Sequence, residues 1–166
     1  SGLSAAEALE RIKAEARHIE YRQLALVDAA GNGAAFSGAR TLGTHRTVIE
    51  PDVVAAGNLL SSPAVPERMV QAFLSTPQLS LGARLIHAMR AALEAGGEEG
   101  PVHSVGMLLV REVAWPVADL RVDWHDTDPI GELARLWELW EPQLDAYVSR
   151  GIDPSLAPSY GVPGDM

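Results

Sequence analysis

Four polar residues that could bind a metal ion or transfer a proton lie within six positions of each other, at Asp123, His125, Asp126 and Asp128. Carboxylates and imidazole are ligands that hard and borderline metal ions accept. However, this spacing matches no established metal site, and Asp128 before Pro129 is typical of a helix N-terminus. We therefore interpret the segment as a strand-to-helix junction without a metal. A metal-dependent hydrolase using Asp123, His125 and Asp126 remains an alternative.

A second candidate segment is residues 57–63, which read Gly-Asn-Leu-Leu-Ser-Ser-Pro and join an apolar strand to a predicted helix. Junctions of this kind often line pockets. The side-chain amide of Asn58 could donate a hydrogen bond to an oxyanion that develops during a reaction. The same side chain could instead bond the neighbouring backbone in a turn. Both readings stay open at this point.

Other catalytic patterns are weaker. Five histidines and many serines permit a Ser/His/Asp triad by composition, but the chain has no Gly-x-Ser-x-Gly motif. The segments Gly31-Asn32-Gly33 and Gly96-Gly97 lack the spacing of a phosphate-binding loop and predict turns or helix ends. The absence of cysteine excludes thiolate nucleophiles, disulfides and Cys-based metal sites.

Composition limits the class of protein. The chain has 166 residues with a net charge of -9 and a sequence pI of about 4.9. This negative field repels nucleic acid and anionic membrane surfaces. No apolar run approaches the roughly 20 residues of a membrane span. We expect a soluble, cytoplasmic protein with no nucleic-acid, membrane or cofactor partner.

The elements that must position these residues can be predicted from periodicity and capping signals. Their order, with helices and strands not strictly alternating, predicts an α+β layered fold. A proline at position 142 predicts a bend in the last helix. The expected helices cover residues 4–17, 63–74, 81–93 and 129–150, and the expected strands cover residues 22–28, 34–38, 47–49, 53–57, 102–110 and 120–125.

Two aromatic residues of the last helix, Trp137 and Trp140, lie at helical spacing. We expect them to pack in the core or to form a subunit contact rather than to bind a ligand. An exposed face of this kind would favour a homo-oligomer, in the simplest case a homodimer.

Four stretches in this order resemble one known family. They are residues 21–31 (YRQLALVDAAG), residues 56–60 (AGNLL), residues 119–133 with DLRVD and DPI-x-EL, and residues 157–165 (APSYGVPGD). Together they are similar to a bacterial and archaeal domain of unknown function catalogued as "ten twenty-eight", which is assigned to the N-terminal-nucleophile (Ntn) hydrolase fold.

The resemblance implies a four-layer α-β-β-α sandwich, here apparently without its N-terminal strands, over residues 1–150, followed by an extended Pro/Gly-rich tail over 151–166. It also implies a hydrolase, an amidase acting on a small linear amide or related C–N bond. In such enzymes the first residue of the mature chain attacks the carbonyl, and its own α-amine acts as the base.

The resemblance further implies site residues. Asn58, Ser104 and Asp123 are the expected catalytic residues, and Gly57 and His125 the expected substrate contacts, with no metal. Ser1 precedes Gly2 and a helix cap instead of heading a strand, so we expect the nucleophile on a preceding segment or on a companion chain.

The chain departs from the family pattern in residues 97–104, where Glu98 and Glu99 replace an Asp/Arg-rich stretch. This departure weakens a role of that loop in binding a substrate carboxylate. A non-catalytic binding or assembly module of the same fold is the main alternative function.

Overall fold

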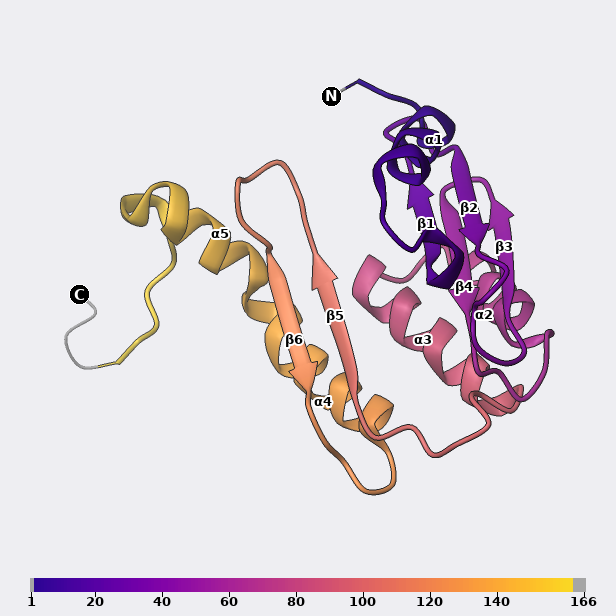
Figure 1. Cartoon of the computed structure of the whole chain (residues 1–166). Helices are drawn as coiled ribbons and strands as arrows, with labels where there is room; N and C mark the ends of the chain where they lie inside the picture. Colours follow the sequence, from indigo (N-terminus) through magenta and orange to yellow (C-terminus); the bar gives the residue numbers. More distant parts are fainter. Residues whose placement is uncertain (1, 163–166) are drawn as a thin grey trace. The chain divides into compact units, whose positions relative to one another are not determined.

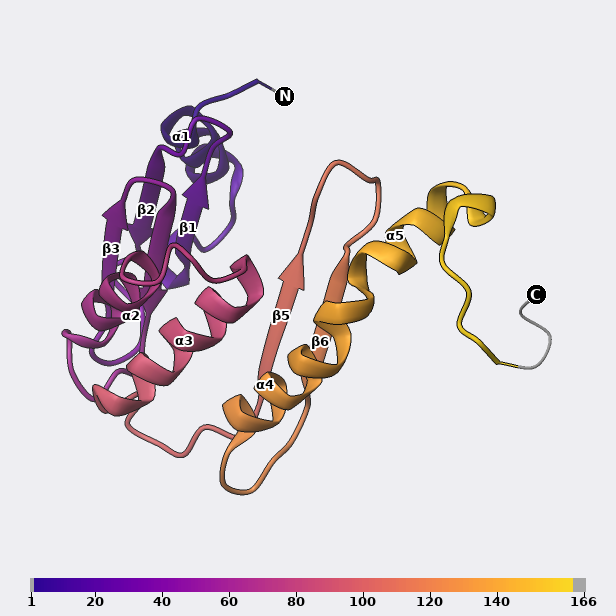
Figure 2. The same ribbon diagram turned by 180° about the vertical axis from the view of Figure 1, so that it is seen from behind.

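The computed structural model describes residues 2–162, so Ser1 and the last residues of the expected tail, 163–166, lie outside the described part. The chain divides into two compact units, Ser1–Val102 and His103–Met166, and each is described by itself. Both units combine helices with small antiparallel sheets (Figures 1 and 2), as expected for an α+β protein.

The first unit begins with helix α1, Ala5–Glu15, which packs on the hairpin of strands β1, Gln23–Val27, and β2, Gly33–Ser37. The hydroxyl of Ser4 accepts the amide of Glu7, and the Glu7 carboxylate accepts the amide of Ser4, so the predicted capping box is present. The buried face of this layer consists of Ala5, Leu9 and Ala34, with Leu24, Leu26 and Phe36 packed around them.

A second hairpin follows, formed by strands β3, Arg46–Glu50, and β4, Val53–Gly57. The two strands pair antiparallel with Val48 opposite Ala55. Pro51 lies in the tight turn between them, together with Asp52 at a φ of 65°. Its missing N–H therefore interrupts no strand ladder.

The two hairpins of the first unit pack against each other, β1 along β4 and β2 along β3. Small residues permit this approach, since a Cβ at Gly33 would lie 2.5 Å from Cγ2 of Ile49 and 2.7 Å from Cγ2 of Val54. Helix α2, Val65–Leu74, covers the second hairpin, and helix α3, Leu81–Glu94, packs on α2. In this unit α1 therefore contacts the first hairpin, the first hairpin contacts the second, and α2 contacts the second hairpin.

The second unit contains the hairpin of β5, Val105–Leu109, and β6, Ala118–Val122, covered by helix α4, Pro129–Trp140. Leu133, Trp137 and Met107 are buried between them. The apolar run 102–110 predicted a strand covered on both faces, but Leu108 is 57% exposed. Alternate residues of a strand face opposite sides, and in this unit α4 covers only one of them.

The predicted bend near Pro142 is present as a short 3-10 turn, Glu141–Gln143, between α4 and helix α5, Leu144–Ile152. The helix runs two residues past the expected start of the extended tail, and a further 3-10 turn covers Pro154–Leu156. Among residues 2–162, none of the helices combines the length and the apolar character that crossing a bilayer requires.

Candidate functional site

Asn58 follows the last residue of β4. The residues after it are fixed by backbone hydrogen bonds to two other segments of the chain. The amide of Leu59 donates to the carbonyl of Leu42 at 3.1 Å, and the amide of Leu60 donates to the carbonyl of Thr44 at 2.9 Å. On the other side, the carbonyl of Leu59 accepts the amide of Glu99 at 2.8 Å. Leu59 itself adopts a φ of 51°, which is unusual for a branched side chain. The position of Asn58 is therefore set by the fold.

The side chain of Asn58 bonds a residue far away in the sequence, not its neighbouring backbone. Its Nδ2 donates a long hydrogen bond of 3.4 Å to Oε1 of Gln23. Gln23 in turn donates from Nε2 to Oγ of Ser37 at 3.1 Å and to the carbonyl of Gly57 at 3.0 Å. Gln23 thereby links β1, β2 and β4 at one end of the paired hairpins.

This network leaves hydrogen-bonding capacity on Asn58. A primary amide carries two N–H donors and a carbonyl acceptor. In the described part of the chain, one donor of Asn58 binds Gln23, and no partner occupies its second N–H or its Oδ1. A substrate carbonyl could accept the second N–H. The sequence analysis missed Gln23 and Ser37, although a glutamine directly before an apolar strand was a usable signal.

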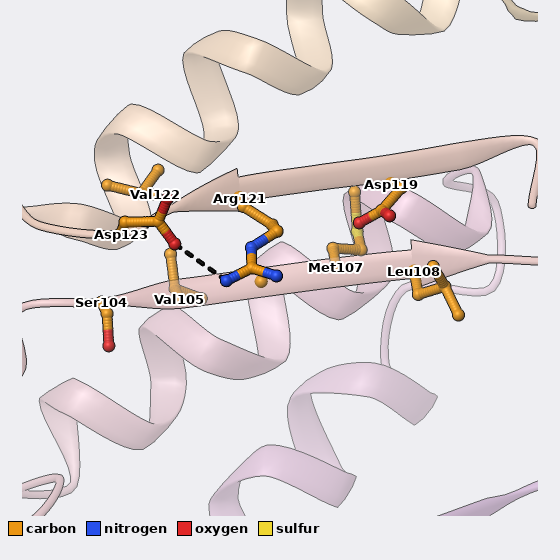
Figure 3. A pocket seen from close by; sticks show the side chains of 9 residues that line it. Ser104, Val105, Met107, Leu108, Asp119, Arg121, Val122 and Asp123 are labelled. Atoms are coloured by element: carbon orange, nitrogen blue, oxygen red, sulfur yellow. Dashed lines mark hydrogen bonds and ion pairs between the residues drawn. The ribbon is translucent and has the colours of Figure 1, made fainter.

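In the second unit, Ser104 and Asp123 line an open depression of about 480 Å³ on the face of β5 and β6 that α4 does not cover (Figure 3). Asp119 and Arg121 share this face. Nη2 of Arg121 donates to Oδ1 of Asp123 at 2.9 Å. This hydrogen bond, followed by the charges of Asp123 and Asp119, raises the pKa of the Arg121 guanidinium above its ordinary value. Asp123 is therefore held by a cation that the sequence analysis had not included.

His125 is half-buried in the segment between β6 and α4. Its Nδ1 accepts the amide of Thr127 at 3.2 Å and the amide of Asp128 at 2.9 Å. An acceptor nitrogen carries no proton, so the neutral ring holds its proton on Nε2. His125 can therefore donate a hydrogen bond to a substrate through Nε2, and its Nδ1 is not free to act as a base.

The residues of the metal alternative are engaged separately. Asp123 binds Arg121, His125 binds backbone amides, and Oδ1 of Asp126 accepts the indole N–H of Trp124 at 2.9 Å. Over residues 2–162, the structure gathers no group of three or more His, Asp or Glu side chains suited to a metal ion. Asp128 caps α4 by accepting the amide of Gly131 at 2.7 Å, as the junction interpretation predicted.

The expected site residues fall in two units. The first unit holds Gly57 and Asn58 together with Gln23, and the second unit holds Ser104, Asp123 and His125.

The tryptophans of the last helix do not form an exposed patch. Trp137 is 5% exposed. The partly buried Trp140 donates from Nε1 to the carbonyl of Val117 at 3.0 Å. Trp137 is therefore buried and Trp140 partly buried, while the buried indole N–H of Trp137 has no hydrogen-bond partner in the described part of the chain.

Comparison with known proteins places the chain in a family. It belongs to a family of unknown function, DUF1028, whose family model matches residues 1–133. The family expected from the four stretches of sequence is therefore confirmed. No curated protein matches the chain.

A solved structure supports the same assignment. The chain is similar to the crystal structure of a protein from Silicibacter pomeroyi that carries the DUF1028 family model, with 32% sequence identity and a TM-score of 0.74. The similarity covers 83% of this chain and 60% of that protein, so the chain spans about three fifths of the length of its solved relative.

Proposed function

We propose that this chain forms part of an Ntn-type hydrolase that cleaves a small linear amide or a related C–N bond. In this proposal Asn58 contacts the reacting carbonyl, and the nucleophile comes from polypeptide outside residues 1–166. The observation that carries the proposal is the order of contacts in the first unit, from α1 through the two hairpins to α2, with the Asn58 amide held at one end of the paired hairpins by Gln23.

The proposed chemistry needs few groups. A hydroxyl or thiol at a chain N-terminus attacks the carbonyl carbon while the terminal amine takes its proton. The tetrahedral oxyanion accepts the second N–H of Asn58. The C–N bond then breaks, the amine leaves with the proton, and water hydrolyses the resulting ester or thioester. An α-amine is suited to this role because its pKa, about 7.7–8.0, lies near working pH.

The second unit carries a separate group of polar side chains that could bind a small molecule. Arg121 and Asp123 form a solvent-exposed ion pair near Ser104, and His125 presents an N–H donor from Nε2. Such donors and acceptors suit a small polar molecule with an amide or carboxyl group. In the proposal Ser104 supplies a hydroxyl to a molecule bound on this face of the second unit, and Asp123 orients that molecule.

The role of Asn58 can be tested by substitution in the protein expressed from the complete natural gene. We expect Asn58→Ala, and Asn58→Asp with its unchanged size, each to lower turnover of a panel of linear amides at least about tenfold, because each removes the N–H donor. Asn32→Ala, at the opposite turn of the β1–β2 hairpin, is the matched control and should keep activity. Equal rates for Asn58→Ala and the unsubstituted protein would remove Asn58 from the site.

The nucleophile can be tested separately by intact-mass measurement and N-terminal sequencing of the same material. We expect a chain that begins with Thr, Ser or Cys. If no chain of the purified protein begins with one of these residues, the Ntn proposal is wrong.

A second candidate, a non-catalytic assembly module, is favoured by the exposed residues on the face of β5 and β6 opposite α4. Leu108 on this face is 57% exposed, and Asp119 and Arg121 lie beside it. An absence of turnover together with an N-terminus lacking a nucleophile would favour this module.

A further inference from the structure

The outer edge of β3 has no strand partner within residues 2–162, because β3 pairs only with β4. A groove of about 470 Å³ runs along this edge, between β3 and α2. Val48 and Val70 line it together with Leu74, which is 42% exposed. An unpaired edge beside an apolar groove is a surface to which another strand can add by main-chain hydrogen bonds.

The charges of β3 are arranged so that the strand is complementary to itself. The strand reads Arg-Thr-Val-Ile-Glu, with Arg46 and Glu50 at its two ends and both exposed. Arg46 makes one ion pair, with Glu67 of α2 at 3.0 Å, and about half of each side chain stays exposed. Within the described part of the chain, the side chain of Glu50 has no hydrogen-bond or ion-pair partner, while its backbone pairs with Val53 in the hairpin.

We propose that a second copy of this chain pairs with β3 in antiparallel orientation, around a two-fold axis at Val48. In this register Val48 lies opposite Val48 of the second copy, and Arg46 lies opposite Glu50 of the second copy at both ends. Opposite charges directly across an antiparallel pair stabilise it. A two-fold interface must bring the same patch together from both copies, and β3 satisfies this condition.

The register also follows the alternation of the strand. Arg46, Val48 and Glu50 point to the same face of β3, because side chains of a strand alternate. This is the face next to α2, where Arg46 reaches Glu67. The apolar contact at Val48 then lies at the groove floor, and the two ion pairs flank it.

Strand β6 also carries opposite charges, at Asp119 and Arg121, and its Arg121 is bound within the same chain by Asp123, as Arg46 is by Glu67. The substitutions in β3 described below distinguish the two strands. The inference does not depend on the proposed hydrolase, since its measured quantity is the oligomeric state and not turnover.

The test measures the mass of the chain by sedimentation equilibrium over a wide range of protein concentration. We expect a dimer. Arg46→Glu and Glu50→Arg should each raise the dissociation constant at least about tenfold, because each places like charges opposite each other at both ends. Mixing the two variants should restore dimers, since the pair of unlike chains has opposite charges at both ends. The double variant Arg46→Glu/Glu50→Arg should also dimerise.

A second measurement covers the case in which a charge reversal prevents folding. The chain has no cysteine, so Val48→Cys introduces a single thiol. In the proposed register the two Cα atoms lie about 4.5–5.5 Å apart, within the usual range for a disulfide. Mild oxidation should therefore give a covalent dimer. Ile49→Cys is the control. In the proposed register residue 49 lies opposite residue 47 of the second copy, so the two thiols are two residues apart along the strand and should not cross-link.

Three outcomes would overturn the inference. The first is a monomer at all concentrations. The second is a dimer that neither charge reversal weakens, which would place the interface elsewhere. The third is a dimer that both reversals weaken but that neither mixing nor the double variant restores, which would mean that Arg46 and Glu50 do not face each other across a two-fold axis.

Discussion

At the scale of single residues, Asp28 connects three parts of the first unit. Its carboxylate accepts the amide of Ala5 at the start of α1 at 3.1 Å, and the amides of Ala30 and Asn32 in the hairpin turn at 2.9 Å each. These hydrogen bonds, led by the one from Ala5, lower the pKa of Asp28 below its ordinary value. The carboxylate form is therefore the form that the folded state favours.

This lowered pKa predicts an acid-sensitive contact. Above the unfolded pKa of about 3.9 the stabilisation is fully present, and it is lost as the pH falls through the lower folded pKa. We expect Asp28→Ala to lower the melting temperature at pH 7 and to give a shallower decline in acid than the unsubstituted protein. Thermal unfolding by circular dichroism between neutral pH and pH 2 measures both. Glu94→Ala, an exposed carboxylate on α3, should leave the acid profile unchanged, and an equally steep decline in Asp28→Ala would contradict the assignment.

At the scale of elements, the end of β2 packs closely on the 3-10 turn Ile19–Tyr21 that precedes β1. Gly38 is buried there, and a Cβ at this position would overlap the backbone of Glu20. Backbone cannot move aside as a flexible side chain can, so we expect Gly38→Ala to destabilise the protein by about 1–3 kcal/mol. Gly100→Ala is the control, because a Cβ there meets nothing within 4 Å. Urea unfolding compares the two, and equal midpoints would contradict the packing.

At the scale of the whole molecule, the division into two compact units has a spectroscopic consequence. All four tryptophans lie at positions 115–140, within the second unit, so their fluorescence reports that unit. Leu133 is 0% exposed, and we expect Leu133→Ala to destabilise this unit by about 2–5 kcal/mol.

The matched control for the two units is Leu9→Ala, in the core of the first unit. We expect it to shift amide hydrogen exchange of β1 and β2 while the fluorescence transition stays in place. In Leu133→Ala the reverse should hold. If both variants shift both signals equally, the two units unfold as one cooperative body, and the expectation of independent unfolding is wrong.

Local rules were sufficient for much of the fold. The Ser4 capping box, the Gly/Asn turn of the first hairpin, the Asp128 cap and the break at Pro142 were all predicted correctly. Each depends on residues within a few positions of one another, so the interactions that determine them are visible in a short stretch of chain. The four family stretches were likewise sufficient to assign DUF1028.

The candidate site was harder to predict, because its contacts join distant residues. The partner of Asn58 is Gln23, 35 positions earlier, and the turn interpretation of Asn58 could not be separated from the site interpretation until this bond was seen. Spacing likewise could not show that Nδ1 of His125 is occupied by backbone amides. The same limit applies to Leu108, whose exposure depends on which elements cover its strand.

The amino-acid order alone thus specified each α-helix and strand, several caps and turns, and the family, because periodicity and capping act over one or two turns of chain. Only the three-dimensional packing determined which side chains meet across elements, namely Gln23 with Asn58, Arg121 with Asp123 and the two hairpins at Gly33. These contacts depend on how layers approach one another, and that distance is set by the volumes of residues far apart in the chain.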